Sequence, residues 1–591
     1  MNFKPDNFQT KVLSEFNQGN KEVAISKLKK YLVINPKDIN ARLNLAYMYI
    51  NFNLIHKAIY EYEHILKKSQ NLQAMFNLAI CFSRLEKFRK CENLLKKVIK
   101  IDKNHFKAYR ALSDIYFNLN NLEKALKFLK LAKQLVPDDP ILLNILGAVE
   151  MKRGNYKIAE KYFLECIRVK KNNKSALNNL AALYQKIGKA DKSLKIFNEL
   201  MIKFPNDHSL LNNIGNVFID LNRYEDAIKH LKNAIKMYPS QSSYFSNLGR
   251  ALFFYKKYKN AEEKIKESLI LNPNNYEAHL ILFYLLIIKN DLKKAWQHFD
   301  SRLRVKHYFI PKNLNLLRSV KNKKILVLRE AGLGDEILYS SMYSELIKEN
   351  NRVVIECDQR LKNIFRRSFN YNNFISQSLT LKNKSNFNKF DISIYAGSLS
   401  GIFRKKLSDF NYKYYLKPDE KYVEFYKRKL RKLNHLPKIG ISWISSRLDL
   451  GKDKSIELEE LLPILKRKNL SFINLQYGDF TKTINYFNKK HRLTIIDMPE
   501  LDKFYDIEKL LALISGLDLV LTVSNTTAHL AGSVGKKTFL LAPDNRAQLF
   551  YWMLSRNKSP WYPSIQIFKK NINWNEALRN IQLNLNRAFK D

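Results

Sequence analysis

Residues 106–139 read FKAYRALSDIYFNLNNLEKALKFLKLAKQLVPDD, and this stretch decides the fold of the first half of the chain. Apolar residues recur at helical spacing in two segments, with Leu112 and Tyr116 in the first and Leu129 in the second. The pattern predicts a pair of helices, and Pro137 ends the second helix before another pair begins.

The same pattern returns along the chain at a fixed interval. A small residue recurs every 34 residues, with one interval of 33: Ala24, Ala58, Cys91, Ala125, Ala159, Ser193, Ala227, Ala261 and Ala295. The 34-residue period is typical of tetratricopeptide repeats, in which helices A and B of each repeat cross closely at this residue, position 20. The six glycines before residue 313 fit the same register, at position 8 or at the turn at position 15: Gly147, Gly215, Gly249, Gly19, Gly154 and Gly188. We therefore predict about nine helical-pair repeats over residues 1–312.

Position 6 of helix A faces the concave groove of such an array. It is asparagine in five of seven consecutive repeats: Asn44, Asn77, Asn179, Asn213 and Asn247. An asparagine amide donates and accepts hydrogen bonds at once, so this ladder could hold the backbone of a protein or peptide acceptor. The alternative is ordinary repeat chemistry, because the whole chain is rich in asparagine and this position often carries it.

After residue 312 the pattern changes to short β-rich runs that alternate with helices. Residues 324–328 form a predicted strand, Gly332 and Gly334 a tight turn, Asp335 the start of a helix, and 352–356 the next strand. This order is a βαβ unit, which places the turn at the carboxyl edge of a parallel sheet, where ligands bind.

A second sheet follows, with predicted strands at 438–443, 470–476, 517–523 and 537–541. The third of these runs into Ser524 to Thr527, a polar turn, and then a helix of small residues that ends at Gly535. The backbone N–H groups at the start of that helix, with the threonine hydroxyls, would form a cradle for a diphosphate. The alternative is that the threonines only cap the helix.

Residues 324–571 resemble the family 9 (heptosyltransferase-like) glycosyltransferases. The resemblance is carried by REAGLGDEILYSSMYSEL, VVIECDQRL, IGISW, INLQYGD, LDLVLTVSNTTAHLAGSVGKKTFLLAP and SPWYPSIQIF. It implies a GT-B fold of two Rossmann-like lobes, an acceptor-side lobe at 313–435 and a nucleotide-sugar donor lobe at 436–591. The whole chain is then an all-α tetratricopeptide superhelix followed by an α/β GT-B fold. This combination is also similar to the protein O-GlcNAc transferases, in which repeats feed a polypeptide to a GT-B domain.

The resemblance also implies roles for individual residues. The catalytic base of the family corresponds to Asp335, with Glu336 as the weaker candidate; the alternative is that Asp335 only caps its helix. Candidate donor contacts are Gly334, Ser442, Arg447, Lys454, Gln476, Ser524, Thr526, Thr527 and His529, of which His529 could instead be a packed helix residue. No convincing DxD motif adjoins a strand end, so we expect neither a metal nor a cofactor, and a nucleotide-sugar as substrate.

The formal charge of +48 would favour anionic ligands such as sugar nucleotides. No arginine-rich stripe stands out, so nucleic acid is not the expected partner. The cysteines form no CxxC pair: Cys81, Cys91, Cys166 and Cys357. Together with a start, MNFKPDNFQT, that lacks an apolar signal core, this favours a cytoplasmic protein.

The expected function is therefore an inverting, metal-independent glycosyltransferase that acts on a hydroxyl of a protein recruited by the repeats. Two alternatives stay open. The acceptor could be a lipid-linked or envelope glycan, in which case the positive charge would help the protein dock on an anionic membrane. The chain could also be a non-catalytic scaffold whose repeats bind partners.

Overall fold

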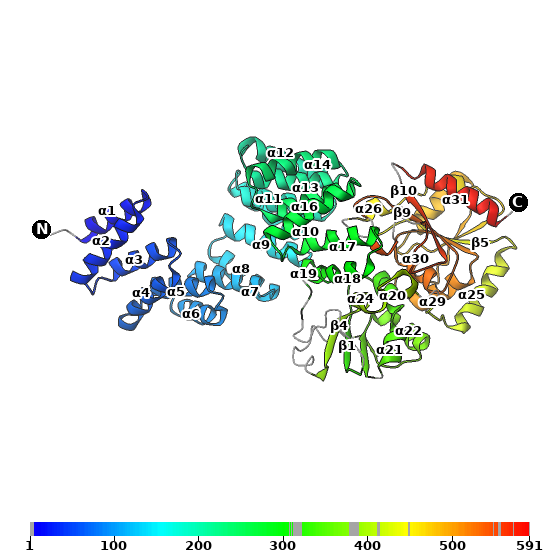
Figure 1. Ribbon diagram of the computed structural model, residues 1–591, viewed down its shortest axis with the longest axis horizontal. Helices are drawn as coiled ribbons and strands as arrows, with labels where there is room; N and C mark the ends of the chain where they lie inside the picture. The colour runs from blue at the N-terminus through cyan, green and yellow to red at the C-terminus, as the bar shows by residue number, and fades with distance from the viewer. Residues whose placement is uncertain are drawn as a thin grey trace. The chain divides into compact units, whose positions relative to one another are not determined.

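The computed structural model describes residues 5–306, 308, 310, 322–350, 352–376, 389–410, 414–446, 450–547, 549–552, 557–570 and 573–589 (Figure 1). The chain divides into two compact units, Met1–Tyr184 and Gln185–Asp591. This division falls within the repeats, whereas the sequence predicts a boundary after residue 312, in a connector that lies mostly outside the described residues. The later repeats belong to the second unit, in which side chains of the last repeat, such as Phe283 and Trp296, share a hydrophobic core with the α/β region.

Helix pairs make up the first unit and continue into the second. The first unit contains α1 (Pro5–Asn17), α2 (Lys21–Ile34), α3 (Ile39–Asn51), α4 (Ile55–Lys68), α5 (Leu72–Arg84), α6 (Phe88–Ile101), α7 (Phe106–Asn118), α8 (Leu122–Leu135), α9 (Pro140–Arg153), α10 (Tyr156–Val169) and most of α11 (Lys174–Lys186). The second unit adds α12 (Ala190–Lys203), α13 (His208–Asp220), α14 (Tyr224–Met237), α15 (Ser242–Phe254), α16 (Tyr258–Leu271), α17 (Tyr276–Ile288), α18 (Leu292–Phe299) and the short α19 (Ser301–Val305). The predicted helical-pair repeats are confirmed.

Close packing inside each pair explains the residue types of the repeat. All nine small side chains predicted at position 20 are fully buried. A Cβ added at Gly147 would stand 2.4 Å from the ring of Phe163, and one added at Gly215 would stand 2.6 Å from Leu231. The nine residues at position 15 all have positive φ: Gly19, Asn53, Glu86, Asn120, Gly154, Gly188, Asn222, Lys256 and Asn290. The register therefore fixes a left-handed turn whether or not glycine is present, and asparagine is the most frequent substitute.

The α/β region contains two sheets, each wholly parallel. Sheet A has the order β3-β2-β1-β4 and sheet B the order β10-β9-β8-β5-β6-β7. The strands of sheet A are β1 (Ile325–Leu328), β2 (Val353–Glu356), β3 (Phe374–Ile375) and β4 (Ile392–Tyr395). Those of sheet B are β5 (Lys438–Ser442), β6 (Ser471–Asn474), β7 (Ile495–Ile496), β8 (Leu519–Val523), β9 (Thr538–Pro543) and β10 (Ile565–Lys570). The strands predicted from sequence are confirmed, and the strands at the edges of the sheets are additional.

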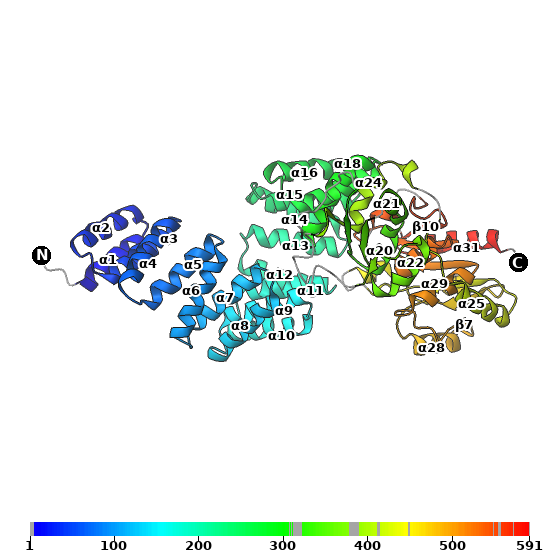
Figure 2. The same cartoon turned by 90° about the horizontal axis from the view of Figure 1, so that it is seen from below.

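Helices cover these sheets. Those that matter below are α20 (Leu333–Ser340), α21 (Tyr343–Glu349), α22 (Lys362–Phe369), α24 (Ser400–Phe403), α25 (Glu420–Leu433), α26 (Gly451–Lys454), α29 (Ile507–Gly516), α30 (Thr526–Ser533) and α31 (Asn575–Ala588). Figure 1 and Figure 2 both show α25 beside α29, and Gly516 lies against Leu430. Helix α25 therefore packs with sheet B, although its sequence falls in the predicted segment 313–435. In the described part of the chain, no helix is both long and apolar enough to cross a bilayer.

Candidate functional site

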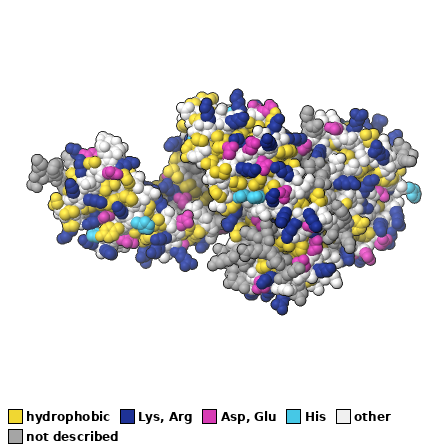
Figure 3. Space-filling model, viewed as in Figure 1, with side chains coloured by type: hydrophobic (Ala, Val, Ile, Leu, Met, Phe, Trp, Pro, Cys, Tyr) yellow, Lys and Arg dark blue, Asp and Glu magenta, His cyan; other side chains and the backbone are white. Residues whose placement is uncertain are grey.

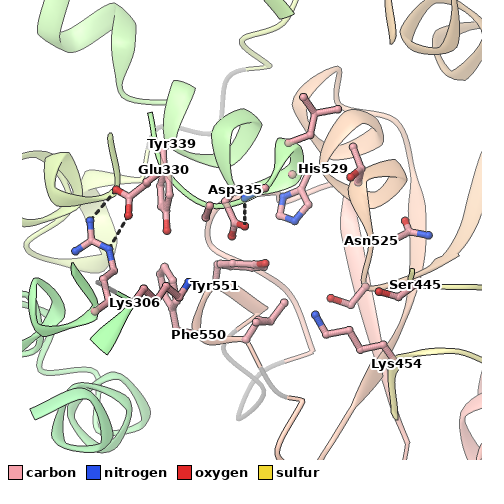
Figure 4. A pocket seen from close by; sticks show the side chains of 18 of the residues that line it. Lys306, Glu330, Asp335, Tyr339, Ser445, Lys454, Asn525, His529, Phe550 and Tyr551 are labelled. Atoms are coloured by element: carbon pink, nitrogen blue, oxygen red, sulfur yellow. Dashed lines mark hydrogen bonds and ion pairs between the residues drawn. The ribbon is translucent and has the colours of Figure 1, made fainter. Parts of the chain in front are cut away.

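A cavity of about 330 Å³ lies where two strand-to-helix turns meet within the second unit. One turn joins β1 to α20 and contributes residues 330–335; the other joins β8 to α30 and contributes residues 524–526 and His529. The loops after β5 and β6 and helix α26 complete the polar wall, and α17 of the last repeat forms part of the opposite wall (Figure 4). The carboxyl ends of parallel strands from both sheets thus converge on one cavity, where α/β proteins bind ligands.

Asp335 both caps α20 and faces the cavity. Its Oδ2 accepts a hydrogen bond from the backbone N–H of Gly332 at 3.2 Å. Its side chain also lines the cavity, as does the ring of Tyr551 (Figure 4). The two interpretations of Asp335, a helix cap and a carboxylate available to a ligand, are therefore compatible in this geometry.

Glu336, the weaker candidate base, is placed differently. It is buried, pairs with Arg329, and accepts a hydrogen bond from the backbone N–H of Asp358 at 2.9 Å. Burial raises the pKa of its carboxyl to about 7. It is not among the residues that line the cavity, so of the two acidic residues only Asp335 is in a position to meet a ligand there.

Asn525 caps α30, a role that the sequence assigns to the threonines. Its Oδ1 accepts from the backbone N–H of Thr527 at 3.0 Å, and its Nδ2 donates to Ser442 Oγ at 2.8 Å. Thr526 lines the cavity, whereas Thr527 is buried behind it and its N–H is already bonded. The asparagine that precedes a helix is itself a capping signal, so this residue could have been found from the sequence.

Two predicted donor contacts, Ser442 and Gln476, lie behind the cavity wall. Gln476 is fully buried, and its Oε1 accepts from Ser442 Oγ at 3.1 Å and from the backbone N–H groups of Trp443 and Ile444 at 3.0 and 2.8 Å. Neither residue lines the cavity. These side chains hold the loop after β5 in place, because they satisfy its buried N–H groups. Their expected direct contact with the donor is thus corrected to a supporting role.

Positive charge reaches the cavity from several sources. Lys454, at the end of α26, is 4% exposed and lines the cavity, and Lys306 of the segment after α19 lines it as well (Figure 4). The N-termini of α20 and α30 also open onto the cavity, and helix N-termini carry partial positive charge. Arg447, the other predicted basic contact, lies outside the described residues. The arrangement suits an anionic ligand such as a diphosphate.

His529 lies on the cavity wall and is packed at the same time. Burial lowers the pKa of its imidazole to about 4; Asp335 opposes this effect and Lys454 adds to it. Its Nδ1 lies 3.0 Å from the hydroxyl of Tyr562. The ring is therefore neutral at pH 7 and offers a hydrogen bond to a ligand, not a charge.

Sequence reasoning missed the aromatic and apolar side of the cavity. Leu280 and Tyr284 of α17 line it, together with Phe550 and Tyr551 of the segment after β9. These residues are separated from the two strand-to-helix turns by tens to hundreds of residues, so no local pattern joins them. Within the described residues, no group of three or more His, Cys, Asp or Glu side chains is placed to hold a metal ion.

A buried ion pair forms part of the cavity wall. Arg302 Nη2 and Nε contact Glu330 Oε1 and Oε2 at 2.7 and 2.9 Å, and the guanidinium stacks on Phe299, 3.9 Å from the ring centre. Glu330 also accepts from the backbone N–H of Gly397 at 2.5 Å. The pair joins the end of the repeats to the loops that follow β1 and β4.

Asparagines of the predicted ladder form hydrogen bonds with other side chains of the repeats. Asn44 Nδ2 donates to Gln9 at 3.1 Å, Asn179 to Asn144 at 2.9 Å, and Asn247 to Asn212 at 2.8 Å. Each partner lies 35 residues earlier, at position 5 of the preceding helix A. Asn213 Oδ1 accepts from Nδ2 of Asn212 at 3.3 Å. These bonds favour the ordinary repeat interpretation, in which the amides join successive helices.

Lysine and arginine are not gathered near any one feature on the visible face of the molecule. Figure 3 shows their side chains spread widely and interspersed with aspartate and glutamate. This distribution agrees with a high charge that belongs to the composition of the chain, not to a single basic patch.

Comparison with known proteins identifies the repeats. Models described as tetratricopeptide repeat match residues 84–148 and 208–241. Protein FlbA of Caulobacter vibrioides is 25% identical over 303 residues, which is 48% of this chain and 50% of that protein. The Hsp70/Hsp90 co-chaperone CNS1 of Saccharomyces cerevisiae is 30% identical over 95 residues, 16% of this chain and 25% of that protein. The chain thus spans half or less of the length of these relatives.

Solved structures of helical-repeat proteins also match part of the chain. A tetratricopeptide repeat protein from Parabacteroides merdae is 16% identical and has a TM-score of 0.37, with 41% of this chain and 97% of that chain covered. The matching family models, together with the 34-residue period, show that the chain carries tetratricopeptide repeats, a class of array whose concave surface binds proteins or peptides.

Proposed function

We propose that the chain is a glycosyltransferase that moves a sugar from a nucleotide-sugar to a hydroxyl of a protein bound by its repeats. The observation that carries the proposal is the cavity between the two sheets, with the carboxylate of Asp335 on one wall and the buried ammonium of Lys454 on the other. Two parallel sheets that present their carboxyl edges to one cavity are what a GT-B enzyme requires.

The donor would occupy the wall formed by sheet B. The N-terminus of α30, Ser524 and Thr526 offer hydrogen-bond donors to a diphosphate, and Lys454 offers a positive charge. Ser445 and Ser446 add polar groups at the same wall. A volume of about 330 Å³ is within the range for small-molecule sites.

Asp335 would act as general base. As the acceptor oxygen attacks the anomeric carbon, the carboxylate takes the hydroxyl proton, and the bond from that carbon to the diphosphate oxygen breaks. The nucleoside diphosphate leaves with the extra negative charge, which Lys454 and the N-terminus of α30 stabilise. One displacement of this kind inverts the anomeric centre. Because protein groups supply the positive charge, we expect turnover to be unchanged by EDTA.

The repeats support a protein as acceptor. They are a class of array that binds polypeptides, and α17 of the last repeat contributes Leu280 and Tyr284 to the cavity wall. A chain held by the array would therefore be delivered beside Asp335.

The test is transfer from a panel of UDP-, GDP- and ADP-sugars, measured as donor hydrolysis and as labelling of a cell lysate. We expect labelled polypeptide with the wild type, and Asp335→Asn should lower transfer by at least about 100-fold, because loss of a general base typically costs that much. The matched control is Asp409→Asn. Asp409 caps a short helix in the same way, through a 3.0 Å bond from the N–H of Lys406, but lies outside the cavity.

The other possible results of this assay distinguish a glycan acceptor, a non-catalytic scaffold and a different catalytic base. Labelled lipid in place of polypeptide would favour a glycan acceptor at a membrane. Absence of turnover with every donor, with retained capture of proteins by the repeats, would favour a scaffold. Equal activity of Asp335→Asn and wild type would remove Asp335 from the role of base.

A further inference from the structure

Helix α26 contacts the repeats with one side chain and the cavity with the next. Lys454 lines the cavity, whereas the neighbouring carboxylate of Asp453 is bonded to other segments. Asp453 Oδ1 accepts from Nδ2 of Asn222, in the turn between α13 and α14, at 3.3 Å, and from Nδ2 of Asn545 at 3.2 Å. The position of Lys454 is therefore tied to contacts that its own helix makes with the repeats.

Arg546 bridges the two sides of this contact. Its Nη1 donates to Asp220 Oδ1, at the end of α13, at 3.0 Å, and its Nε lies 3.2 Å from Asp453 Oδ2. The side chains of Arg546 and Asp220 are 16% and 24% exposed, so water screens the pair only in part. Asp220 also accepts from Nε2 of Gln185 at 2.9 Å. One guanidinium thus joins a carboxylate of the repeats to the carboxylate beside Lys454.

The segment that carries Arg546 also forms another part of the cavity. Residues 544–547 follow β9, and Phe550 and Tyr551 of the cavity wall come three residues later in the sequence. Lys256, in the turn between α15 and α16, pairs with Asp544 at 2.6 Å. The repeats therefore contact both α26 and residues 544–547, the segment that leads to Phe550 and Tyr551.

We infer that Arg546 is a positioning residue, through which the repeats hold Lys454 at the ligand. The inference rests on the proposed function for the nature of that ligand, a nucleoside diphosphate. Arg546 itself does not line the cavity, so it acts through Asp453 and through its own chain segment. The later repeats are in this sense a part of the donor site and not only a module that recruits an acceptor.

Hydrogen exchange on the full chain tests the inference without any ligand. Asp220→Asn and Arg546→Gln should each increase the rate of exchange in residues 450–456 and 544–552 by about tenfold or more. Asp220→Glu keeps the charge, so its exchange in these segments should stay close to that of wild type. The matched control is Glu165→Gln, which removes a similarly exposed 2.9 Å ion pair with Lys133 between α8 and α10. Unchanged exchange in both segments for Asp220→Asn and Arg546→Gln would overturn the inference.

Binding of UDP, GDP and ADP by calorimetry gives the second arm. We expect Asp220→Asn to weaken the best of these probes by about tenfold and Asp220→Glu by less than threefold. If none of the three binds to the wild type, the proposed function is contradicted, while the exchange measurement still decides the positioning role. If Asp220→Asn changes exchange in the two segments but leaves nucleotide affinity intact, the positioning of Lys454 is contradicted.

Discussion

Gly334 of α20 lies directly against the imidazole of His529 of α30. A Cβ at residue 334 would stand 2.7 Å from His529 Cδ2, closer than two such atoms can approach. We expect Gly334→Ala to push the two helices apart and so lower stability by about 1–3 kcal/mol, as overpacked cores do. Thermal unfolding followed by tryptophan fluorescence will measure this, because four of the five tryptophans lie after residue 324.

Gly332→Ala is the control for this substitution, from the same turn. A Cβ there would meet only Asp335 Oδ2, at 3.7 Å, and the φ of −97° is open to any residue. It should leave the transition within about 1 °C of wild type. Equal destabilisation by both substitutions would show that the turn, and not the contact between the helices, is responsible.

Lys454→Gln should weaken binding of a nucleoside diphosphate. The buried ammonium is the cation on the sheet B wall of the cavity, and a hydrogen bond to a charged group contributes about 1.5–3 kcal/mol, so affinity should fall by about 10- to 100-fold. Lys452→Gln, on the same helix but exposed, should change affinity by less than twofold. Calorimetric titration with UDP, GDP and ADP measures the affinity of both variants. If the two substitutions weaken binding equally, the net charge of the protein, and not the position of Lys454, is responsible.

Glu336 should make stability depend on pH. Burial raises its pKa in the folded state from the ordinary 4.5 to about 7, so the folded state holds the proton more tightly. This contribution to stability is lost as pH rises from 4.5 through 7. The free energy of unfolding of wild type, relative to that of Glu336→Gln, should therefore fall across this pH range by up to about 3 kcal/mol. Denaturant titrations at pH 4.5, 5.5, 6.5 and 7.5 measure the free energy of unfolding of both proteins. If the free energy of unfolding of wild type relative to Glu336→Gln rises with pH, the assignment is contradicted.

Asn44→Ala should loosen the first repeat. Loss of the bond to Gln9 removes a link between α3 and α1, and such a bond contributes about 1 kcal/mol. We expect faster hydrogen exchange in α1, with unchanged exchange in α5. Asn40→Ala, one turn earlier on α3 and exposed, is the control. If instead Asn44→Ala leaves exchange intact but abolishes capture of proteins from a lysate, the amide serves a bound peptide and not its neighbour.

The repeats were predictable because their determinants are local. Each pair needs a small residue at position 20, a left-handed turn at position 15 and a residue that ends helix B, and all three recur within 34 residues. At position 15 glycine was the only signal used, yet Glu86 and Lys256 adopt the same turn with φ of 56° and 63°. The packing of the two helices therefore imposes the turn even on residues that disfavour it.

The cavity was predictable only in part. Gly334, Asp335, Ser524 and Thr526 were found because a strand, a tight turn and a helix start leave a continuous signal in the sequence. The direction of a side chain at a strand end leaves no such signal, which is why Gln476 was expected at the ligand and instead supports a loop.

Residues that reach the cavity from distant parts of the chain were not predictable either. Tyr284 comes from the last repeat and Tyr551 from the segment after β9, and only the packing of the repeats on the sheets brings them together. Arg546 is a further case, because its two carboxylate partners are separated by more than two hundred residues of sequence.

The buried pair of Arg302 and Glu330 bears on how such a chain can evolve. Deletion of the final repeats would strand Glu330 without its guanidinium, and breaking a buried pair in this way costs about 3–5 kcal/mol. Repeats within Met1–Tyr184 belong to a separate compact unit, so whole 34-residue modules there can be duplicated or lost without breaking this pair. Natural variation in array length should therefore accumulate at the amino-terminal end, changing the span of polypeptide that is bound while the chemistry stays the same.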